Sequence, residues 1–211
     1  MTDVVHVAQV MMPERGLFLV RCAPPLPPNG AQALVTLDYG PDFGMVMESG
    51  VYDPAKHGTR VPGFQLVRLK EPADDATLAE NEKLSQAMRT TFLKTAQTCA
   101  PNLRVPYVRL SFGRTRLFLV FAADGQQRPD LSRPSAELRR IFGVEVKAWQ
   151  MGPRDEVSVM GALGPCGRAC CCCTWQKRYP SHLNAERFRG ENPSQLNGTC
   201  GRFKCCLAFD G

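Results

Sequence analysis

The sequence predicts an α+β protein with three regions: a small β-barrel-like region over residues 1–72, an α+β region over 73–160 and a Cys-rich region over 161–211. Short β-branched and aromatic runs, separated by Gly, Pro and Asn, fill the first region. A four-residue apolar period marks a helix early in the second region. Eight of the ten cysteines lie in the third region.

The first region contains several short strand candidates. Residues 23–30, "APPLPPNG", cannot form a central strand because proline donates no ladder hydrogen bond, so a loop is expected there. Many short strands with such loops predict a small barrel or a strongly curved sheet. The strand candidates are residues 4–10, 16–22, 32–40 and 43–50.

The second region opens on a helix. Thr77 and Glu80 have the spacing of a capping box, which predicts the helix N-terminus at this point. Cys99 continues the apolar stripe that follows, and we therefore expect it to be a small buried hydrophobe. The stripe consists of Leu84, Met88, Phe92 and Ala96, followed by Cys99.

A sheet with one more helix is expected after this helix. Residues 105–112 and 117–122 are strand candidates that the short segment 113–116 joins as a hairpin. Residues 135–142 read as a shorter helix and 144–151 as a further strand. The order helix, strand, strand, helix, strand is typical of an α+β layer with an antiparallel sheet.

Composition restricts the class of protein. Hydrophobic residues make up 44% and charged residues 22% of the 211 residues, which is ordinary for a soluble globular protein. No apolar run reaches membrane-spanning length, and the N-terminus lacks the pattern of a secretory signal. We therefore expect a cytoplasmic protein whose thiols stay reduced. The formal charge of +6 and the pI near 8.9 permit nucleic-acid contact without requiring it.

The Cys-rich region carries one motif twice. "GPCGRACCCCTW" (164–175) aligns without gaps on "GTCGRFKCCLAF" (198–209), at an offset of 34 residues. Cys170 and Cys173 have no counterpart in the second copy and are surplus to the pattern. The aromatic residues Trp175 and Phe209 match, and we expect both to be packing anchors. The matched residues are Cys166, Gly167, Arg168, Cys171 and Cys172 in the first copy and Cys200, Gly201, Arg202, Cys205 and Cys206 in the second.

This motif favours metal or redox chemistry over disulfides. Neighbouring cysteines bridge poorly, and clustered thiols in a reducing compartment are typical of metal or redox sites. The glycine after each first cysteine permits a sharp turn, and the arginine beside it should lower thiol pKa values. Six thiolates suit a soft metal or an iron–sulfur cluster. The predicted metal ligands are Cys166, Cys171, Cys172, Cys200, Cys205 and Cys206, with Cys170 and Cys173 as possible extra ligands and Gly167, Arg168, Gly201 and Arg202 as the motif turns.

Other motifs are lacking. The spacing is not that of a zinc finger, and the Cys-x2-Cys series of ferredoxins does not occur. His6, His57 and His182 are scattered, no catalytic triad or carboxylate pair emerges, and no phosphate-binding loop is present. We therefore predict no catalytic residues and no enzymatic activity.

The segments "MGPRDEVSVMGALGPCGRACCCCTW" and "ENPSQLNGTCGRFKCCLAFD" resemble the signature of the bacterial RicT/YaaT family, which carries the polymerase-suppressor-type, or PSP-one, C-terminal domain. The resemblance extends to residues 4–10, to the helix after Thr77 and to residues 117–125. Cys170 and Cys173 depart from the family, which usually has Leu and Ser there. The spacer 180–192 also looks about two residues shorter than usual.

The resemblance implies a non-catalytic accessory protein of the bacterial cytoplasm. Family members assemble with two small helical proteins, RicA and RicF, into a complex that carries [4Fe–4S] clusters. That complex acts with ribonuclease Y in messenger RNA maturation and is connected with the phosphorelay that governs sporulation. The resemblance therefore implies RicA-like and RicF-like partners and an iron–sulfur cofactor bound by the six motif cysteines.

Two alternatives remain open. The first is a nucleic-acid-binding module stapled by zinc. The second is a redox protein that uses a vicinal thiol pair near Arg168 or Arg202, although no Cys-x-x-Cys lies at the end of a βα unit as a thioredoxin-like site would require. The basic residues that support the first are Arg168, Lys177, Arg178, Arg187, Arg189, Arg202 and Lys204.

Overall fold

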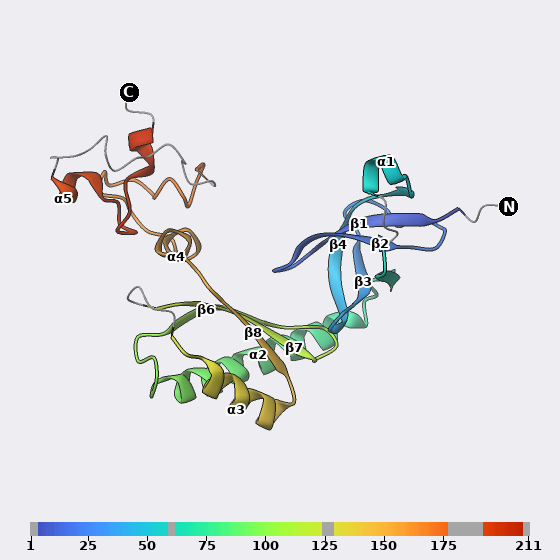
Figure 1. Ribbon diagram of the computed structural model, residues 1–211, viewed down its shortest axis with the longest axis horizontal. Coiled ribbons are helices and arrows are strands. Elements are labelled where there is room, and N and C mark those ends of the chain that lie inside the picture. The colour runs from blue at the N-terminus through green and yellow to red at the C-terminus, as the bar shows by residue number, and fades with distance from the viewer. Residues whose placement is uncertain (1–3, 59–61, 124–128, 177–191, 209–211) are drawn as a thin grey trace. The chain divides into compact units, whose positions relative to one another are not determined.

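The computed structural model describes residues 4–58, 62–123, 129–176 and 192–208 (Figure 1). It contains two sheets and several helices, which confirms the α+β class. Across those ranges, none of the helices combines the length and the apolar character needed to cross a membrane. The chain groups into two compact units, one formed by residues 1–95, 108–119 and 131–147 and the other by 96–107, 120–130 and 148–211.

Five strands of the first unit form a closed ring in the order β1-β2-β5-β3-β4. Its interior is filled by apolar side chains, among them the fully buried Val10, Val20, Val35 and Val46. A single parallel residue pair, Arg21 with Gln65, joins β2 to β5. The fifth strand was not predicted, whereas the other four match their predicted segments closely. The strands are β1 (His6–Met12), β2 (Gly16–Arg21), β3 (Gln32–Leu37), β4 (Gly40–Val51) and β5 (Gln65–Leu69), and the short helix α1 (Pro54–His57) follows β4.

The long helix α2 (Asp74–Ala96) begins before the predicted capping box, which is therefore wrong. The Asp74 carboxylate accepts a hydrogen bond from the Glu71 N–H at 2.8 Å and pairs with Arg68 at 2.7 Å. The N–H groups of Asp74 and Asp75 donate to the Glu71 and Pro72 carbonyls at 3.0 and 3.3 Å, so the first turn forms here and Thr77 lies inside the helix.

The apolar stripe of α2 is confirmed from Met88 to Ala96, whereas Leu84 is only half-buried. Met88, Phe92 and Ala96 are buried. Cys99 is exposed, so its predicted burial is wrong. The reason is that α2 ends at Ala96, and the periodicity that would have placed Cys99 on the buried face stops there.

A second sheet has the strand order β6-β7-β8 (Figure 1). The Ser111 N–H donates to the Arg116 carbonyl at 2.8 Å, as the predicted hairpin requires. Phe118 and Phe121 of β7 and Leu138 of α3 are fully buried. The predicted element order is confirmed. The elements are β6 (Arg104–Leu110), β7 (Arg116–Ala122), α3 (Ser132–Phe142) and β8 (Glu145–Gln150).

The second unit contains a helix that was not predicted, α4 (Pro153–Met160). Pro153 occupies the first turn, and Asp155 and Glu156 lie in that turn as well. Both features are typical of a helix N-terminus, because proline needs no hydrogen-bond acceptor there and carboxylates complement the helix dipole. Two short helices complete the Cys-rich segment, α5 (Pro193–Leu196) and the 3-10 helix η2 (Cys205–Ala208).

Candidate functional site

Both copies of the motif have the same backbone hydrogen bonds. In the first copy, the Gly164 N–H donates to the Arg168 carbonyl at 2.7 Å, and the Gly167 N–H donates to the Gly164 carbonyl at 2.9 Å. The corresponding bonds 34 residues later measure 2.8 and 2.9 Å. Each segment also closes with one antiparallel bridge. The second-copy bonds join Gly198 to Arg202 and Gly201 to Gly198, and the bridges are Leu163–Ala169 and Asn197–Phe203.

Glycine is required at the centre of each turn. Gly167 has a φ of 76° and Gly201 a φ of 72°. In this left-handed region a side chain clashes with the backbone, so the sequence places glycine there. The arginine that follows each glycine is exposed, at Arg168 and at Arg202.

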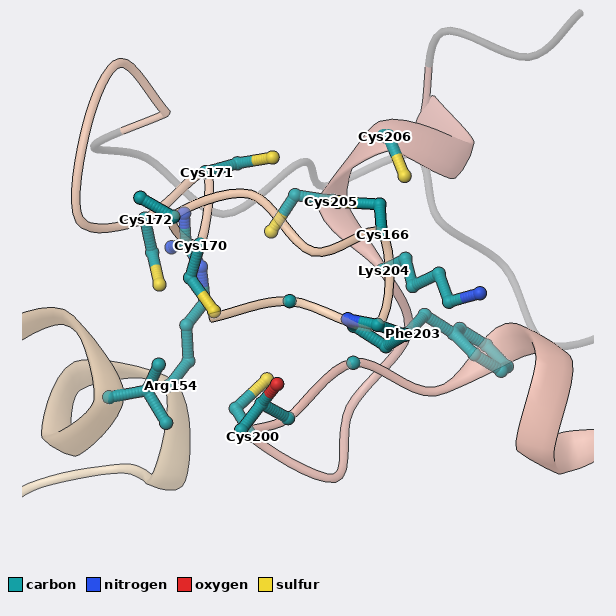
Figure 2. Close-up of a pocket in the computed structure, with 16 residues that line it drawn as sticks. Arg154, Cys166, Cys170, Cys171, Cys172, Cys200, Phe203, Lys204, Cys205 and Cys206 are labelled. Carbon is teal, nitrogen blue, oxygen red and sulfur yellow. The ribbon is translucent and has the colours of Figure 1, made fainter. Parts of the chain in front are cut away.

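The two turns and α4 line one pocket of about 240 Å³ (Figure 2). It contains all six cysteines that the motif predicts as ligands, together with Cys170. Arg154 and Val157 of α4 and Lys204 of the second turn also contribute. Cys173 is not among the lining residues, and its sulfur lies 3.3 Å from the Val157 carbonyl oxygen. The lining cysteines are Cys166, Cys170, Cys171, Cys172, Cys200, Cys205 and Cys206.

Cys171 interacts electrostatically with three other cysteines that line the same pocket. Figure 2 shows the Cys171 sulfur pointing toward Cys205 and Cys206. Burial raises the pKa of the Cys171 thiol, and the negative charges of Cys206, Cys205 and Cys166 raise it further. We call Cys166, Cys171, Cys205 and Cys206 the four-sulfur group. It combines matched cysteines from both copies of the motif.

A second set of sulfurs lies toward α4. In Figure 2 the sulfurs of Cys170 and Cys172 point toward Arg154, away from Cys205 and Cys206. Cys172 is 6% exposed, and burial raises its pKa to about 11, with Cys173 and Cys170 adding to the increase. Arg154 opposes this increase. We call Cys170, Cys172 and Cys173 the three-sulfur group.

The arginines predicted to lower thiol pKa values do not have that effect on Cys171 or Cys172, since both values are raised. Arg168 and Arg202 are exposed, whereas the cation that acts on Cys172 is the buried Arg154.

Cys200 lies apart from both sets, on the opposite side of the pocket (Figure 2). It also borders a second hollow of about 330 Å³, which Arg104 and Glu156 line. The six motif cysteines therefore share a pocket, but four of them are grouped and Cys172 and Cys200 lie elsewhere on its wall.

The thiols of this pocket are suitable ligands for a soft metal, but they do not form a preformed metal-binding site. Thiolates are the ligands that iron–sulfur clusters and zinc prefer. Within the ranges that the structure describes, no three His, Cys, Asp or Glu side chains are close enough to hold a metal ion. Binding by these residues would require side-chain movement or a ligand from another chain.

Comparison with known proteins identifies a relative. The chain is 27% identical over 158 residues to the stage 0 sporulation protein YaaT of Bacillus subtilis (strain 168). The comparison supports membership of the RicT/YaaT family. The match covers 74% of this chain and 57% of the length of YaaT. No protein-family model matches the chain, and no solved structure does.

The prediction of RicT/YaaT membership, made on the duplicated motif, is confirmed. Two residues of the site were missed by sequence reasoning. Arg154 donates to the Gln176 carbonyl at 2.5 Å, and Ser158 donates to the Cys172 carbonyl at 2.8 Å. With Val157 they lie at i, i+3 and i+4 on one face of α4, a spacing that becomes informative only once the helix is recognised.

One further prediction is wrong, and others concern residues that lie outside the described ranges. Trp175 is 59% exposed, so its predicted role as a packing anchor is wrong. Phe209 and the spacer up to residue 191 lie outside the described residues. The same holds for Lys177, Arg178, Arg187 and Arg189.

Proposed function

We propose that this chain is a non-catalytic regulatory adaptor that binds a [4Fe–4S] cluster through its Cys-rich unit and shares that cluster with partner subunits. The observation that supports this most directly is the four-sulfur group, which takes matched cysteines from both turns into one pocket. Four thiolates are the usual ligand set of such a cluster.

The regulatory part of the proposal is supported by the relative, whose name describes a stage 0 sporulation protein. The RicT/YaaT resemblance extends the proposal to the compartment and the partner proteins of this chain. There the chain would act in the cytoplasm with RicA-like and RicF-like proteins and direct maturation of messenger RNA by ribonuclease Y. RNA would then be an indirect partner, bound by the assembly rather than by this chain.

The spacing of the donors supports the proposed sharing of the cluster. Among the described residues, no three His, Cys, Asp or Glu side chains are close enough to hold a metal ion by themselves. An exposed apolar surface lies on α4 and the adjoining first turn, where Val159, Met160 and Leu163 are each more than 60% exposed. Exposed apolar surface of this kind suits a partner protein.

Anaerobic co-purification with RicA-like and RicF-like proteins tests the proposal. We expect iron and sulfide in the purified complex. Cys171→Ser and Cys205→Ser should each remove most of the iron, because serine oxygen is a poor ligand for a soft metal. Cys99→Ser is the matched control, since Cys99 is exposed and lies outside the pocket.

The same preparation distinguishes the alternatives. A colourless, iron-free complex under strictly anaerobic conditions would contradict the proposal. Zinc without iron or sulfide would instead support the zinc-stapled nucleic-acid-binding module, whose RNA binding should weaken as salt increases.

A further inference from the structure

Cys170 and Cys173 are the two ends of one tight turn. The Cys173 N–H donates to the Cys170 carbonyl at 2.8 Å, the hydrogen bond of a β-turn. The Cα atoms at the ends of such a turn lie within about 7 Å of each other. Disulfide-bridged residues usually have Cα atoms about 4.4–6.8 Å apart. The turn therefore brings these two residues to a separation that a disulfide can span.

The surrounding structure holds this turn in place. The Cys170 N–H donates to the Ala162 carbonyl at 2.9 Å, and the Ser158 hydroxyl donates to the Cys172 carbonyl at 2.8 Å. The Cys172 side chain is hydrogen-bonded to Cys173 and interacts electrostatically with Cys170 as well. The backbone of the turn is therefore held by these hydrogen bonds, and the thiols of Cys172 and Cys173 are in contact.

The second copy of the motif supplies an internal comparison. Lys204 and Leu207 stand where Cys170 and Cys173 stand in the first copy. The backbone bonds are nevertheless the same, with the Leu207 N–H donating to the Lys204 carbonyl at 3.1 Å. The turn therefore forms without cysteine at either end. The thiols of Cys170 and Cys173 are therefore not required for the turn to form.

We propose that Cys170 and Cys173 form a site of reversible oxidative modification, in which hydrogen peroxide links them as a disulfide. One thiolate attacks a peroxide oxygen, the O–O bond breaks and a sulfenic acid forms with release of the first water. The second thiol then attacks the sulfenic sulfur, and the hydroxyl leaves as the second water. Two thiols lose two electrons and the peroxide gains them. A small dithiol reverses the reaction by exchange.

The disulfide would change the pocket. Cys170 lines that pocket, and Cys173 donates to the Val157 carbonyl at 3.3 Å. Linking the two sulfurs removes the Cys170 thiol from the pocket wall and breaks the contact of Cys173 with α4. This regulatory consequence rests on the proposed function, whereas formation of the disulfide does not, because it needs no metal.

The test uses the full chain, reduced and free of metal. It is treated with hydrogen peroxide, then alkylated and digested, and the peptide 169–177 is sequenced by mass spectrometry. We expect a disulfide between Cys170 and Cys173, with Cys171 and Cys172 alkylated. When dithiothreitol is added before alkylation, all four cysteines of this peptide should be alkylated. A disulfide to Cys172, or alkylation of both Cys170 and Cys173 while other thiols are oxidised, would overturn the proposal.

Two variants and a control strengthen the test. Cys170→Ser and Cys173→Leu should each lower the loss of thiols from this peptide at least about tenfold. Leucine already occupies the position equivalent to Cys173 in the second turn, and circular dichroism checks that each variant folds. Cys99→Ser, at an exposed thiol outside the pocket, should form the disulfide normally. Unchanged oxidation in both variants would contradict the proposal.

Iron content, measured on separately reconstituted protein, reports on the proposed function alone. A chain that forms the disulfide but never binds iron would contradict the cluster and leave the modification site standing.

Discussion

Arg109 on β6 makes a partly buried ion pair with Asp42 on β4, with Nη2 of the guanidinium 2.9 Å from Oδ2 of the carboxylate. Asp42 is 1% exposed and also accepts hydrogen bonds from the Tyr39 hydroxyl at 2.9 Å and the Phe112 N–H at 3.1 Å. Arg109 pairs with Glu14 as well. A single carboxylate thus joins β4 of the ring to β6 within the first unit.

Replacing this carboxylate should destabilise the first unit. We expect Asp42→Ala to lower the free energy of unfolding by about 3 kcal/mol, because it leaves buried donors without an acceptor. Urea unfolding measures the change. Glu48→Gln is the control: Glu48 pairs with Lys56 at 2.6 Å on the surface, and its loss should destabilise the unit far less because solvent screens the pair. Equal effects of the two substitutions would contradict this role for Asp42.

The start of α2 should make stability depend on pH. Hydrogen bonds from Arg68 and from the Glu71 N–H lower the pKa of Asp74 to about 2, below its ordinary value of about 3.9. The carboxylate therefore stabilises the fold above about pH 4, and this contribution is lost as the pH falls toward 2. Asp74→Asn should be less stable at pH 6 and lose less stability between pH 4 and 2. Urea unfolding across this range tests it, and parallel curves for both proteins would contradict the assignment.

The glycines with positive φ in the two turns should tolerate some substitutions better than others. Gly201→Val should destabilise the second turn by about 1–2 kcal/mol, because φ is positive there. Gly201→Asn should cost less, since asparagine tolerates this conformation. Limited proteolysis of the Cys-rich segment measures the effect. Gly63→Ala is the control, because no atom lies within 4 Å of a Cβ added at Gly63. Valine and asparagine variants that behave alike would contradict the role of φ.

Burial of Cys172 should slow its alkylation in the metal-free chain. With a pKa of about 11, roughly one Cys172 thiol in a thousand is ionised at pH 8. Because the thiolate is the reactive form, its alkylation rate should increase about tenfold per pH unit until the pH approaches 11. Mass spectrometry of timed samples follows the rate, with the exposed Cys99 as a check on the reagent. A rate that levels off below pH 9 would contradict the high pKa.

The local elements of the fold were predictable where one pattern dominated. Alternating β-branched residues located β1 to β4, and the four-residue period located the buried face of α2. The helix start was misplaced because Asp74 gains Arg68 as a partner, which lies outside the helix. Helix α4 was missed although Pro153 and its acidic first turn are standard signals. Its short length leaves too few residues for an apolar period to appear.

By itself, the sequence determined which residues can carry the chemistry: the duplicated motif fixed the glycine turns, the thiols and the resemblance to the RicT/YaaT family. Only the tertiary structure decided how the sulfurs are divided. Cys171 and Cys172 are neighbours in the chain, yet one faces Cys205 and Cys206 and the other faces Arg154. That division depends on α4 and on the second turn, which approach the first turn from distant positions in the chain. The spacing of cysteines within one segment carries no information about such an approach.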